Sequence, residues 1–283
     1  DSGTGSLRWA VGQANSNPGT DEITFDVDGT IFLNSTVRIQ GPVSIVGNGA
    51  EKTILDGQGK CQIFILSQAQ ISSLTFSNGY ERSTRGGGAI HSAHMLNLED
   101  CVFTGNQAFH SGGAIFAGNS LSLTNCIFRD NSAGGPGGAI VASYLYSSLT
   151  TSNPFSLTNC IFRDNSAGLG GAIYAYSRSA DPLTMNITGG EMVGNQANDR
   201  GGAVFLWSGV TGLITGVSFR DNRGSAGGAI YVDSGGLTVS DSFFSGNQSS
   251  ASNLGGGAIW FLGRDVSIIG GEFHANTTPG KGG

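Results

Sequence analysis

The sequence predicts an all-β parallel β-helix, a solenoid in which one chain winds repeatedly over itself, and two recurring motifs predict it. The tetrad Gly-Gly-Ala-Ile, once with Val in place of Ile, starts at Gly87, Gly112, Gly137, Gly170, Gly201, Gly227 and Gly256. A Phe-x-x-Asn motif, once with Met in place of Phe, ends at Asn106, Asn131, Asn165, Asn195, Asn222, Asn247 and Asn276. The tetrads lie 25 to 33 residues apart, a period typical of stacked repeat units.

An internal copy supports stacking over a closed globule. The segment Ser122–Gly134 reappears letter for letter as Ser156–Gly168, as expected for like units laid on one another. A leucine-rich repeat would need a denser Leu pattern and a helical side, and a propeller blade would need about 40 residues. The 48 glycines do not recur at every third position, which excludes collagen.

One repeat shows how a coil forms. Between Gly112 and Asn131, apolar residues alternate with polar ones in three short bursts, which is typical of strands with one buried face. The alternation slips by one residue between Leu123 and Cys126, so we expect a bend there. The glycine pair allows a second bend, because a missing Cβ permits positive φ or close backbone approach. Three strands and three bends fit the 25 residues between Gly87 and Gly112.

Stacked coils would place equivalent residues one strand spacing apart, about 4.8 Å. The motif asparagines are then expected to form a column in which each side-chain amide bonds the next and satisfies turn backbone. We interpret this column as a structural ladder and not as a ligand site, and we call it the Asn ladder. Its members are Asn106, Asn131, Asn165, Asn195, Asn222, Asn247 and Asn276.

The cysteines follow the same logic. Cys101, Cys126 and Cys160 occupy one repeat position, which Leu74 and Val217 fill elsewhere. A position that accepts such residues is a core position, where a free thiol acts as a small hydrophobe. No Cys-x-x-Cys pair is present, so a zinc or redox site has little support.

We expect one domain over residues 1–283, in three parts. Residues 1–20 form an N-terminal cap, in which Ser6–Asn17 carries apolar residues at helical spacing and Ser6 is placed to cap the helix. Residues 21–80 form irregular first coils, with strand-like bursts separated by turn residues such as Gly47–Gly49, and residues 81–283 form the regular repeat. The sequence stops at Gly282–Gly283, where another tetrad would begin, so we expect a further coil or a partner to cover that end.

The amino-acid composition limits which classes of partner the chain can bind. Twenty acidic and 14 basic residues give a net charge of −6, which argues against nucleic acid, because that partner needs a basic surface. No apolar run reaches the roughly 18 residues of a membrane span. No phosphate-loop motif is present and the four histidines are dispersed along the repeat, so we expect no cofactor and no metal.

The paired motifs match a known family. Repeated Gly-Gly-Ala-Ile with Phe-x-x-Asn resembles the polymorphic outer membrane proteins of chlamydiae and their relatives. The segments Gly5–Val11 and Asp21–Phe25 resemble the N-terminal region of many secreted right-handed β-helix proteins. The resemblance implies a right-handed, surface-exposed or secreted β-helix, commonly an adhesin or passenger domain. We expect it to act in adhesion or structural assembly and to bind a glycan or protein ligand through its walls and edge loops. The low charge and the open C-terminal end favour self-association.

The main alternative is a polysaccharide-active enzyme, a lyase or glycoside hydrolase. Such chemistry needs paired carboxylates, or carboxylates with Ca²⁺ and a base. Three Arg-Asp pairs, Arg129–Asp130, Arg163–Asp164 and Arg220–Asp221, precede Asn ladder positions. Asp130 and Asp164 would be stacked neighbours and a potential cation site. We expect instead exposed turns with compensating charges, and hence no catalytic residues.

An outer face offers an interaction surface. If the tetrad Ile or Val points inward, the residue after it points outward, and this gives the candidate interaction face Phe116, Tyr174, Phe205, Tyr231 and Trp260. We predict that this aromatic stripe stacks on sugar rings or packs on another protein; the opposite phase would bury it in the core. The long loops Ser143–Pro154 and Ser177–Pro182 are expected to form a recognition edge.

Four Asn-x-Ser/Thr sequons occur, and two of them, at Asn247 and Asn276, coincide with the Asn ladder. The other two, Asn34 and Asn186, are the candidate glycosylation sites.

Overall fold

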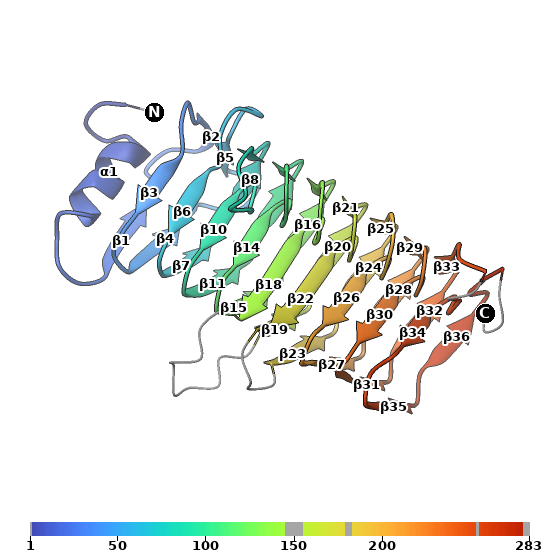
Figure 1. The fold of residues 1–283 in the computed structure, drawn as a ribbon. Helices are drawn as coiled ribbons and strands as arrows, with labels where there is room; N and C mark the ends of the chain where they lie inside the picture. The colour runs from blue at the N-terminus through green and yellow to red at the C-terminus, as the bar shows by residue number, and fades with distance from the viewer. Residues whose placement is uncertain (1, 145–154, 179–182, 253–254, 280–283) are drawn as a thin grey trace.

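The computed structural model describes residues 2–144, 155–178, 183–252 and 255–279. The chain winds into an elongated solenoid with a short helix at its N-terminal end (Figure 1). Each described strand pairs in parallel with the strand one coil earlier or later, so that three sheets run the length of the molecule and a fourth begins at β9. The predicted parallel β-helix is confirmed.

Sheets A and C contain consecutive strands of each coil, the strand of sheet C preceding that of sheet A from β3 onward. Sheet A contains β1 (Asp21–Thr24), β4 (Val43–Val46), β7 (Ala69–Ser72), β11 (Met95–Glu99), β15 (Ser120–Thr124), β19 (Phe155–Thr158), β23 (Leu183–Thr188), β27 (Val210–Thr215), β31 (Gly236–Ser240) and β35 (Asp265–Ile269). Sheet C contains β3 (Val37–Ile39), β6 (Phe64–Leu66), β10 (Ile90–Ser92), β14 (Ile115–Ala117), β18 (Ile140–Tyr144), β22 (Ile173–Ser177), β26 (Val204–Trp207), β30 (Ile230–Asp233) and β34 (Ile259–Phe261).

Two further sheets complete each coil. Sheet B contains β2 (Gly29–Phe32), β5 (Thr53–Asp56), β8 (Thr75–Ser77), β12 (Val102–Thr104), β16 (Ile127–Arg129), β20 (Ile161–Arg163), β24 (Glu191–Val193), β28 (Ser218–Arg220), β32 (Phe243–Ser245) and β36 (Glu272–His274). Sheet D contains β9 (Tyr80–Glu81), β13 (Gln107–Ala108), β17 (Ser132–Ala133), β21 (Ser166–Ala167), β25 (Gln196–Ala197), β29 (Arg223–Gly224) and β33 (Gln248–Ser249). Sheet D adds a fourth strand to the three that were expected in each coil. The sequence did not predict it, because a two-residue strand is too short to show an alternating pattern.

Inside the coils, the motif phenylalanines stack face to face. Neighbouring ring centroids lie 4.7–4.8 Å apart from Phe76 to Phe162, and 4.7 Å apart from Phe219 to Phe273. Met192 pairs in register with both Phe162 and Phe219 and occupies the position between the two stacks. The rings up to Phe244 are fully buried, so this column fills the core along the axis.

The Asn ladder runs beside the rings. The Asn131 backbone N–H and its Nδ2 both donate to Asn165 Oδ1, at 3.1 and 3.0 Å, and Asn165 Nδ2 also donates to the Phe128 carbonyl at 3.0 Å. The same bonds recur from Asn106 through Asn276. Because Asn131 and Asn165 are buried and adjacent, the motif satisfies the polar groups of a turn that has no access to water.

The three motif cysteines lie in the core as interpreted. Cys101, Cys126 and Cys160 are buried and free. The thiols of Cys126 and Cys160 donate to the carbonyls of Thr124 and Thr158 at 3.4 Å, and hydrogen bonding within the column and burial raise the pKa of both thiols. They therefore stay protonated and pack as small core groups.

The two tetrad glycines have different roles. Gly137 has a φ of +71°, a left-handed conformation that glycine adopts without strain. Gly138 does not; a Cβ on it would lie 2.0 Å from the Gly171 carbonyl of the next coil. The first glycine therefore makes the bend, and the second allows consecutive coils to approach.

The cap forms as expected. Helix α1 (Leu7–Ala14) begins at Ser6, whose Oγ accepts a hydrogen bond from the Trp9 backbone N–H at 3.1 Å. The helix buries Leu7, Val11 and Ala14, and the first two belong to the main core. It thereby covers apolar side chains that the end of a solenoid would otherwise expose.

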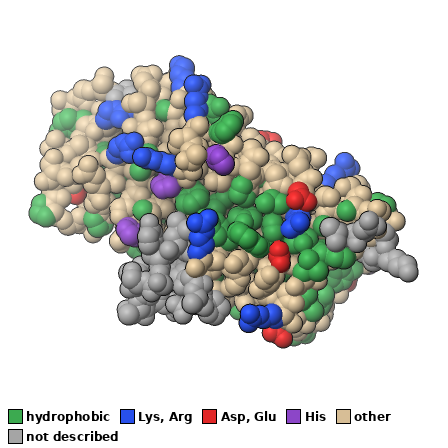
Figure 2. All heavy atoms as spheres, in the orientation of Figure 1, with side chains coloured by type: hydrophobic (Ala, Val, Ile, Leu, Met, Phe, Trp, Pro, Cys, Tyr) green, Lys and Arg blue, Asp and Glu red, His purple; other side chains and the backbone are tan. Residues whose placement is uncertain are grey.

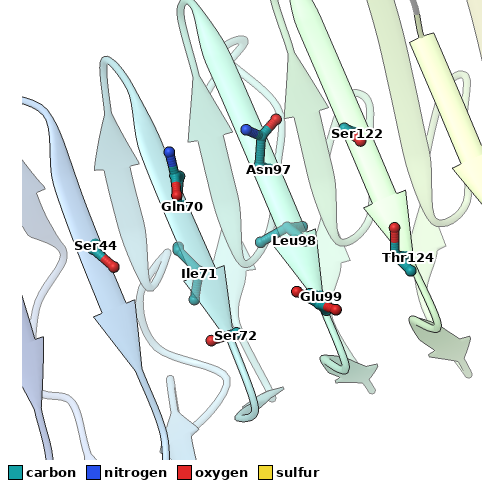
Figure 3. Close-up of a pocket in the computed structure, with 9 residues that line it drawn as sticks. All are labelled: Ser44, Gln70, Ile71, Ser72, Asn97, Leu98, Glu99, Ser122 and Thr124. Atoms are coloured by element: carbon teal, nitrogen blue, oxygen red, sulfur yellow. The ribbon is translucent and has the colours of Figure 1, made fainter.

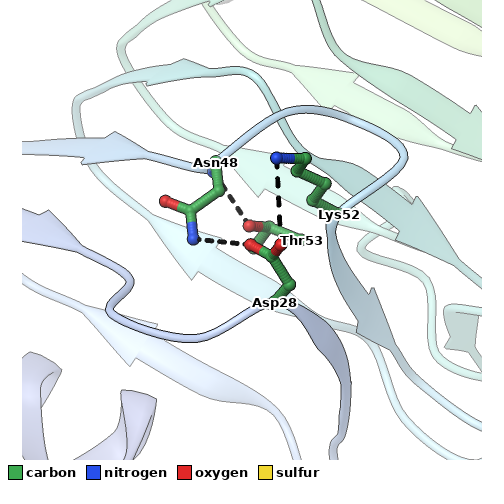
Figure 4. Close-up of polar contacts among 4 residues, drawn as sticks. All are labelled: Asp28, Asn48, Lys52 and Thr53. Carbon is green, nitrogen blue, oxygen red and sulfur yellow. Dashed lines mark hydrogen bonds and ion pairs between the residues drawn. The ribbon is translucent and has the colours of Figure 1, made fainter.

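Polar contacts connect the irregular first coils (Figure 4). Asn48 Nδ2 donates to Asp28 Oδ1 at 3.0 Å, and the Asn48 backbone N–H donates to Thr53 Oγ1 at 2.9 Å. Lys52 lies 3.8 Å from the same aspartate. These bonds between turns replace the motif-based order of the later coils. Strand β7 has only two apolar residues, Ala69 and Ile71, so apolar alternation gives little signal for it.

Candidate interaction face

The residues after each tetrad lie in register on the outside of sheet C. Going along the sheet, the column reads His91, Phe116, Val141, Tyr174, Phe205, Tyr231 and Trp260. Their neighbours in sequence, such as Ile173 and Ala175, belong to the main core, whereas Val141, Tyr174, Phe205 and Tyr231 form a separate hydrophobic cluster. The outward phase is therefore the one present.

The expected open stripe is wrong for the middle of this column. Tyr174, Phe205 and Tyr231 are buried, and Phe116 and Trp260 are partly buried. The covering comes from residues that directly precede the tetrads: Leu169 and Ala226 pack on the rings, and the Arg200 guanidinium lies 5.2 Å from the Tyr231 ring centre. These residues form backbone bridges between coils, a second column that the sequence pattern did not reveal.

A more exposed pair of rings lies two residues further along the same strands. Trp207 is 41% exposed and Tyr176 is partly buried; they are paired in register, with ring centres 6.2 Å apart. Each lies two residues after a ring of the first column, and residues two apart share one face of a strand. That period could have identified them from the sequence.

Together these rings form one outer aromatic patch, which we define as Tyr174, Tyr176, Phe205, Trp207 and Tyr231. Tyr174 contacts Tyr176, Phe205 and Trp207 with ring centres 5.3–6.3 Å apart. Figure 2 shows hydrophobic side chains gathered on the middle of this wall, with charged side chains around them. Buried rings thus support a smaller set of exposed ones.

Charged groups flank the outer aromatic patch. Arg178 lies 5.6 Å from the Tyr176 ring centre, and Asp233 is in register with Trp207. Burial raises the pKa of Tyr174 and of Tyr231, so both hydroxyls remain protonated at neutral pH and can donate hydrogen bonds. The patch therefore combines apolar ring faces with polar groups at its margin, as carbohydrate and protein ligands require.

The outer face of sheet A has a different chemistry (Figure 3). A shallow hollow on sheet A is lined by hydroxyl and amide side chains, among them Gln70, Asn97 and Ser122, with Glu99 as a charged member. Among the described strands of this wall, Leu213 is an exposed apolar residue in register with the sequon residue Asn186. Among its described residues, this hollow offers hydrogen-bonding groups and no aromatic ring.

The Arg-Asp pairs lie at exposed corners after sheet B. Asp130, Asp164 and Asp221 have φ values of 57°, 53° and 54°, and Asn78, Gly105 and Gly194 occupy the same corner in other coils. Asp, Asn and Gly are the residues that tolerate this left-handed conformation. Asp130 and Asp164 are stacked as expected, but the backbone conformation explains their identity, and Arg163 pairs with Glu191 at 3.2 Å.

The remaining candidates are dispersed. Within the described ranges, no group of three His, Cys, Asp or Glu side chains is placed to hold a metal ion, and no described helix has the length and apolarity to cross a membrane. Asn34 lies exposed in the turn before β3, and Asn186 lies on the outer face of β23. Most of the two long loops, residues 145–154 and 179–182, lies outside the described residues.

The comparisons with known proteins agree with this architecture. A family model described as a right-handed β-helix region matches residues 25–188. No curated protein and no solved structure matches the chain.

Proposed function

The chain belongs to the right-handed β-helix family, and on that basis we propose that it is a non-catalytic binding module of an extracellular or cell-surface protein, which holds a glycan or protein ligand on the outer face of sheet C. The resemblance of its paired motifs to chlamydial-type polymorphic outer membrane proteins supports the surface location. The low share of charged residues, 12%, supports recognition by ring stacking and hydrogen bonding over recognition by charge.

The outer aromatic patch is the observation that carries the proposal. Large aromatic residues dominate binding energy where they pack in the centre of an interface. Trp207 is exposed, while the neighbouring Tyr174 ring, whose centre lies 6.3 Å from that of Trp207, is buried and packs on the buried Phe205. A ring held in place before binding loses little conformational freedom when a ligand stacks on it.

The non-catalytic part of the proposal rests on the acidic residues. Asp130, Asp164 and Asp221 are exposed at corners that require a left-handed backbone, which explains them without a reaction. A reducing-end assay on acidic and neutral polysaccharides is expected to show no turnover. Release of new reducing ends that is lost in Asp164→Asn would establish a hydrolase or lyase instead.

The binding site is tested with two tryptophan variants. Trp207→Ala is expected to weaken binding to its best ligand on a glycan and matrix-protein array by at least about tenfold, without loss of folding. Trp9→Ala is the matched control, because Trp9 is 45% exposed on α1, at the capped end of the solenoid. Equal binding by the two variants would show that sheet C is not the binding wall.

A further inference from the structure

A cleft lies near the N-terminal end of sheet C. It has a volume of about 560 Å³ and is lined by the turns 34–36 and 60–62, by β3 and β6, and by β9 with the loop that follows it. Strand β9 is the terminal strand of sheet D. The earlier coils therefore have turns where later coils have sheet D, and the cleft lies at this step.

The cleft is strongly basic in an acidic chain. Arg38, Lys60, Arg82 and Arg85 line it, and Glu81 is the lining carboxylate. In the part of the chain that the structure describes, none of these four cations forms an ion pair with a carboxylate. Figure 2 shows Lys and Arg side chains gathered over the N-terminal coils of this face. Four positive charges on a chain with net charge −6 create a local field that attracts anions.

The one carboxylate is already engaged. Glu81 is 5% exposed. Its Oε1 accepts from the Ser83 backbone N–H at 2.6 Å and from the Ser83 hydroxyl, and its Oε2 accepts from the Gly86 backbone N–H at 3.3 Å. Glu81 therefore holds the loop, and the four cations with this one carboxylate leave the cleft a net charge of +3.

A longer loop supplies two of the cations. Eight positions separate Gly79 from Gly87, whereas six separate the equivalent residue Asn106 from Gly112, and the longer connection carries Arg82 and Arg85. Arg82 and Arg85 thus come from a connection that is longer than the one in the next coil.

Two contacts order this loop. Gln62 Nε2 donates to the carbonyls of Gly86, at 3.0 Å, and Gly87. His91 Nδ1 lies 3.1 Å from the Arg85 carbonyl and must donate, since a carbonyl only accepts. Arg85 is thereby placed before any ligand arrives, which lowers the entropic cost of binding.

We propose that this basic cleft binds an anionic oligosaccharide through its carboxylate or sulfate groups. Arginine guanidinium groups match the two oxygens of such anions with paired hydrogen bonds. The Tyr80 ring, with Arg82 5.0 Å from its centre, and the Ile65 side chain give apolar surface for sugar rings. The hydroxyls of Ser35 and Thr36 supply partners for sugar hydroxyls. This site is separate from the outer aromatic patch and stands whether or not that patch binds.

Paired charge variants of the full chain test the cleft. Binding is measured by titration calorimetry with a heparin-derived oligosaccharide, a galacturonate oligomer and a neutral galactose oligomer, on protein made without N-glycosylation because Asn34 lines the cleft. We expect the unmodified chain to bind one or both acidic probes and not the neutral one. The double variant Arg38→Gln/Arg85→Gln should weaken that binding by at least about tenfold. Both side chains are exposed, so folding should persist.

The matched control removes the same charge elsewhere. Arg129→Gln/Arg264→Gln changes two exposed arginines outside the cleft and should bind as the unmodified chain does. Equal weakening in both double variants would show general charge attraction and overturn the site, as would no binding to either acidic probe. Equal affinity for a single-stranded DNA oligomer would overturn the ligand class. Trp207→Ala should leave acidic-probe binding unchanged.

Discussion

Two columns of aromatic residues run along this solenoid, and they obey different rules. Inside, the motif phenylalanines repeat nearly unchanged and stack with their planes within 11° of parallel. Outside sheet C, the equivalent column changes identity at almost every coil, and Tyr174, Phe205 and Tyr231 meet edge to face at 79–84°. The inner column is uniform in geometry and the outer one is not.

The difference follows from what surrounds each column. A core ring meets the same neighbours in every coil, so the same residue is favoured each time. An outer ring is surrounded by whichever side chains its own turns supply, such as Leu169 or Arg200, and these vary from coil to coil. The uniform column therefore supports the fold, and the variable column is where binding specificity has room to differ.

The largest expected effect is in the Asn ladder. Asn165→Ala leaves buried partners such as the Asn131 N–H and the Phe128 carbonyl without their bonds. Several orphaned buried groups at about 1–3 kcal/mol each should lower the free energy of unfolding by about 5 kcal/mol. Urea unfolding measures it, with the exposed Asn198→Ala as the control near zero. A loss below about 1 kcal/mol would show that the ladder is dispensable.

Ring deletions compare the two columns directly. Phe162→Ala removes a fully buried stacked ring and should cost about 3–5 kcal/mol of unfolding free energy. Phe116→Ala removes a partly buried outer ring that stacks on His91 at 5.1 Å and should cost about 1 kcal/mol, near the value of an aromatic pair. Equal losses in urea unfolding would mean that the outer column is as structural as the inner one.

The smallest expected effect is the pH dependence of the outer column. Burial lowers the pKa of His91 below its usual value. As the pH falls below about 6.5, His91 of the unfolded chain binds a proton that His91 of the folded chain does not. The free energy of unfolding should therefore fall with the pH until the pH reaches the lowered pKa of folded His91. His91→Asn should remove this component. Parallel pH profiles of stability for the two proteins would contradict it.

The residues of the inner column could be predicted from the sequence, because burial favours the same residue type at the same position of each coil. The Asn ladder, the core thiols of Cys101 and Cys160 and the Ser6 cap all depend on local patterns that recur or are contiguous. The corner aspartates were also predictable in principle, since Asp130 alternates with Asn and Gly at one repeat position, which is the pattern of a left-handed backbone.

By itself, then, the sequence determined the winding, its period, the cap and the inward-facing residues, because each coil repeats the same local pattern. Only the tertiary structure decided which outer rings are covered, that Trp207 is the exposed ring of the outer aromatic patch, and that Arg38, Lys60 and Arg85 meet at one cleft. Exposure and charge clustering depend on side chains from different coils and turns, and no repeat in the sequence records which of these come together.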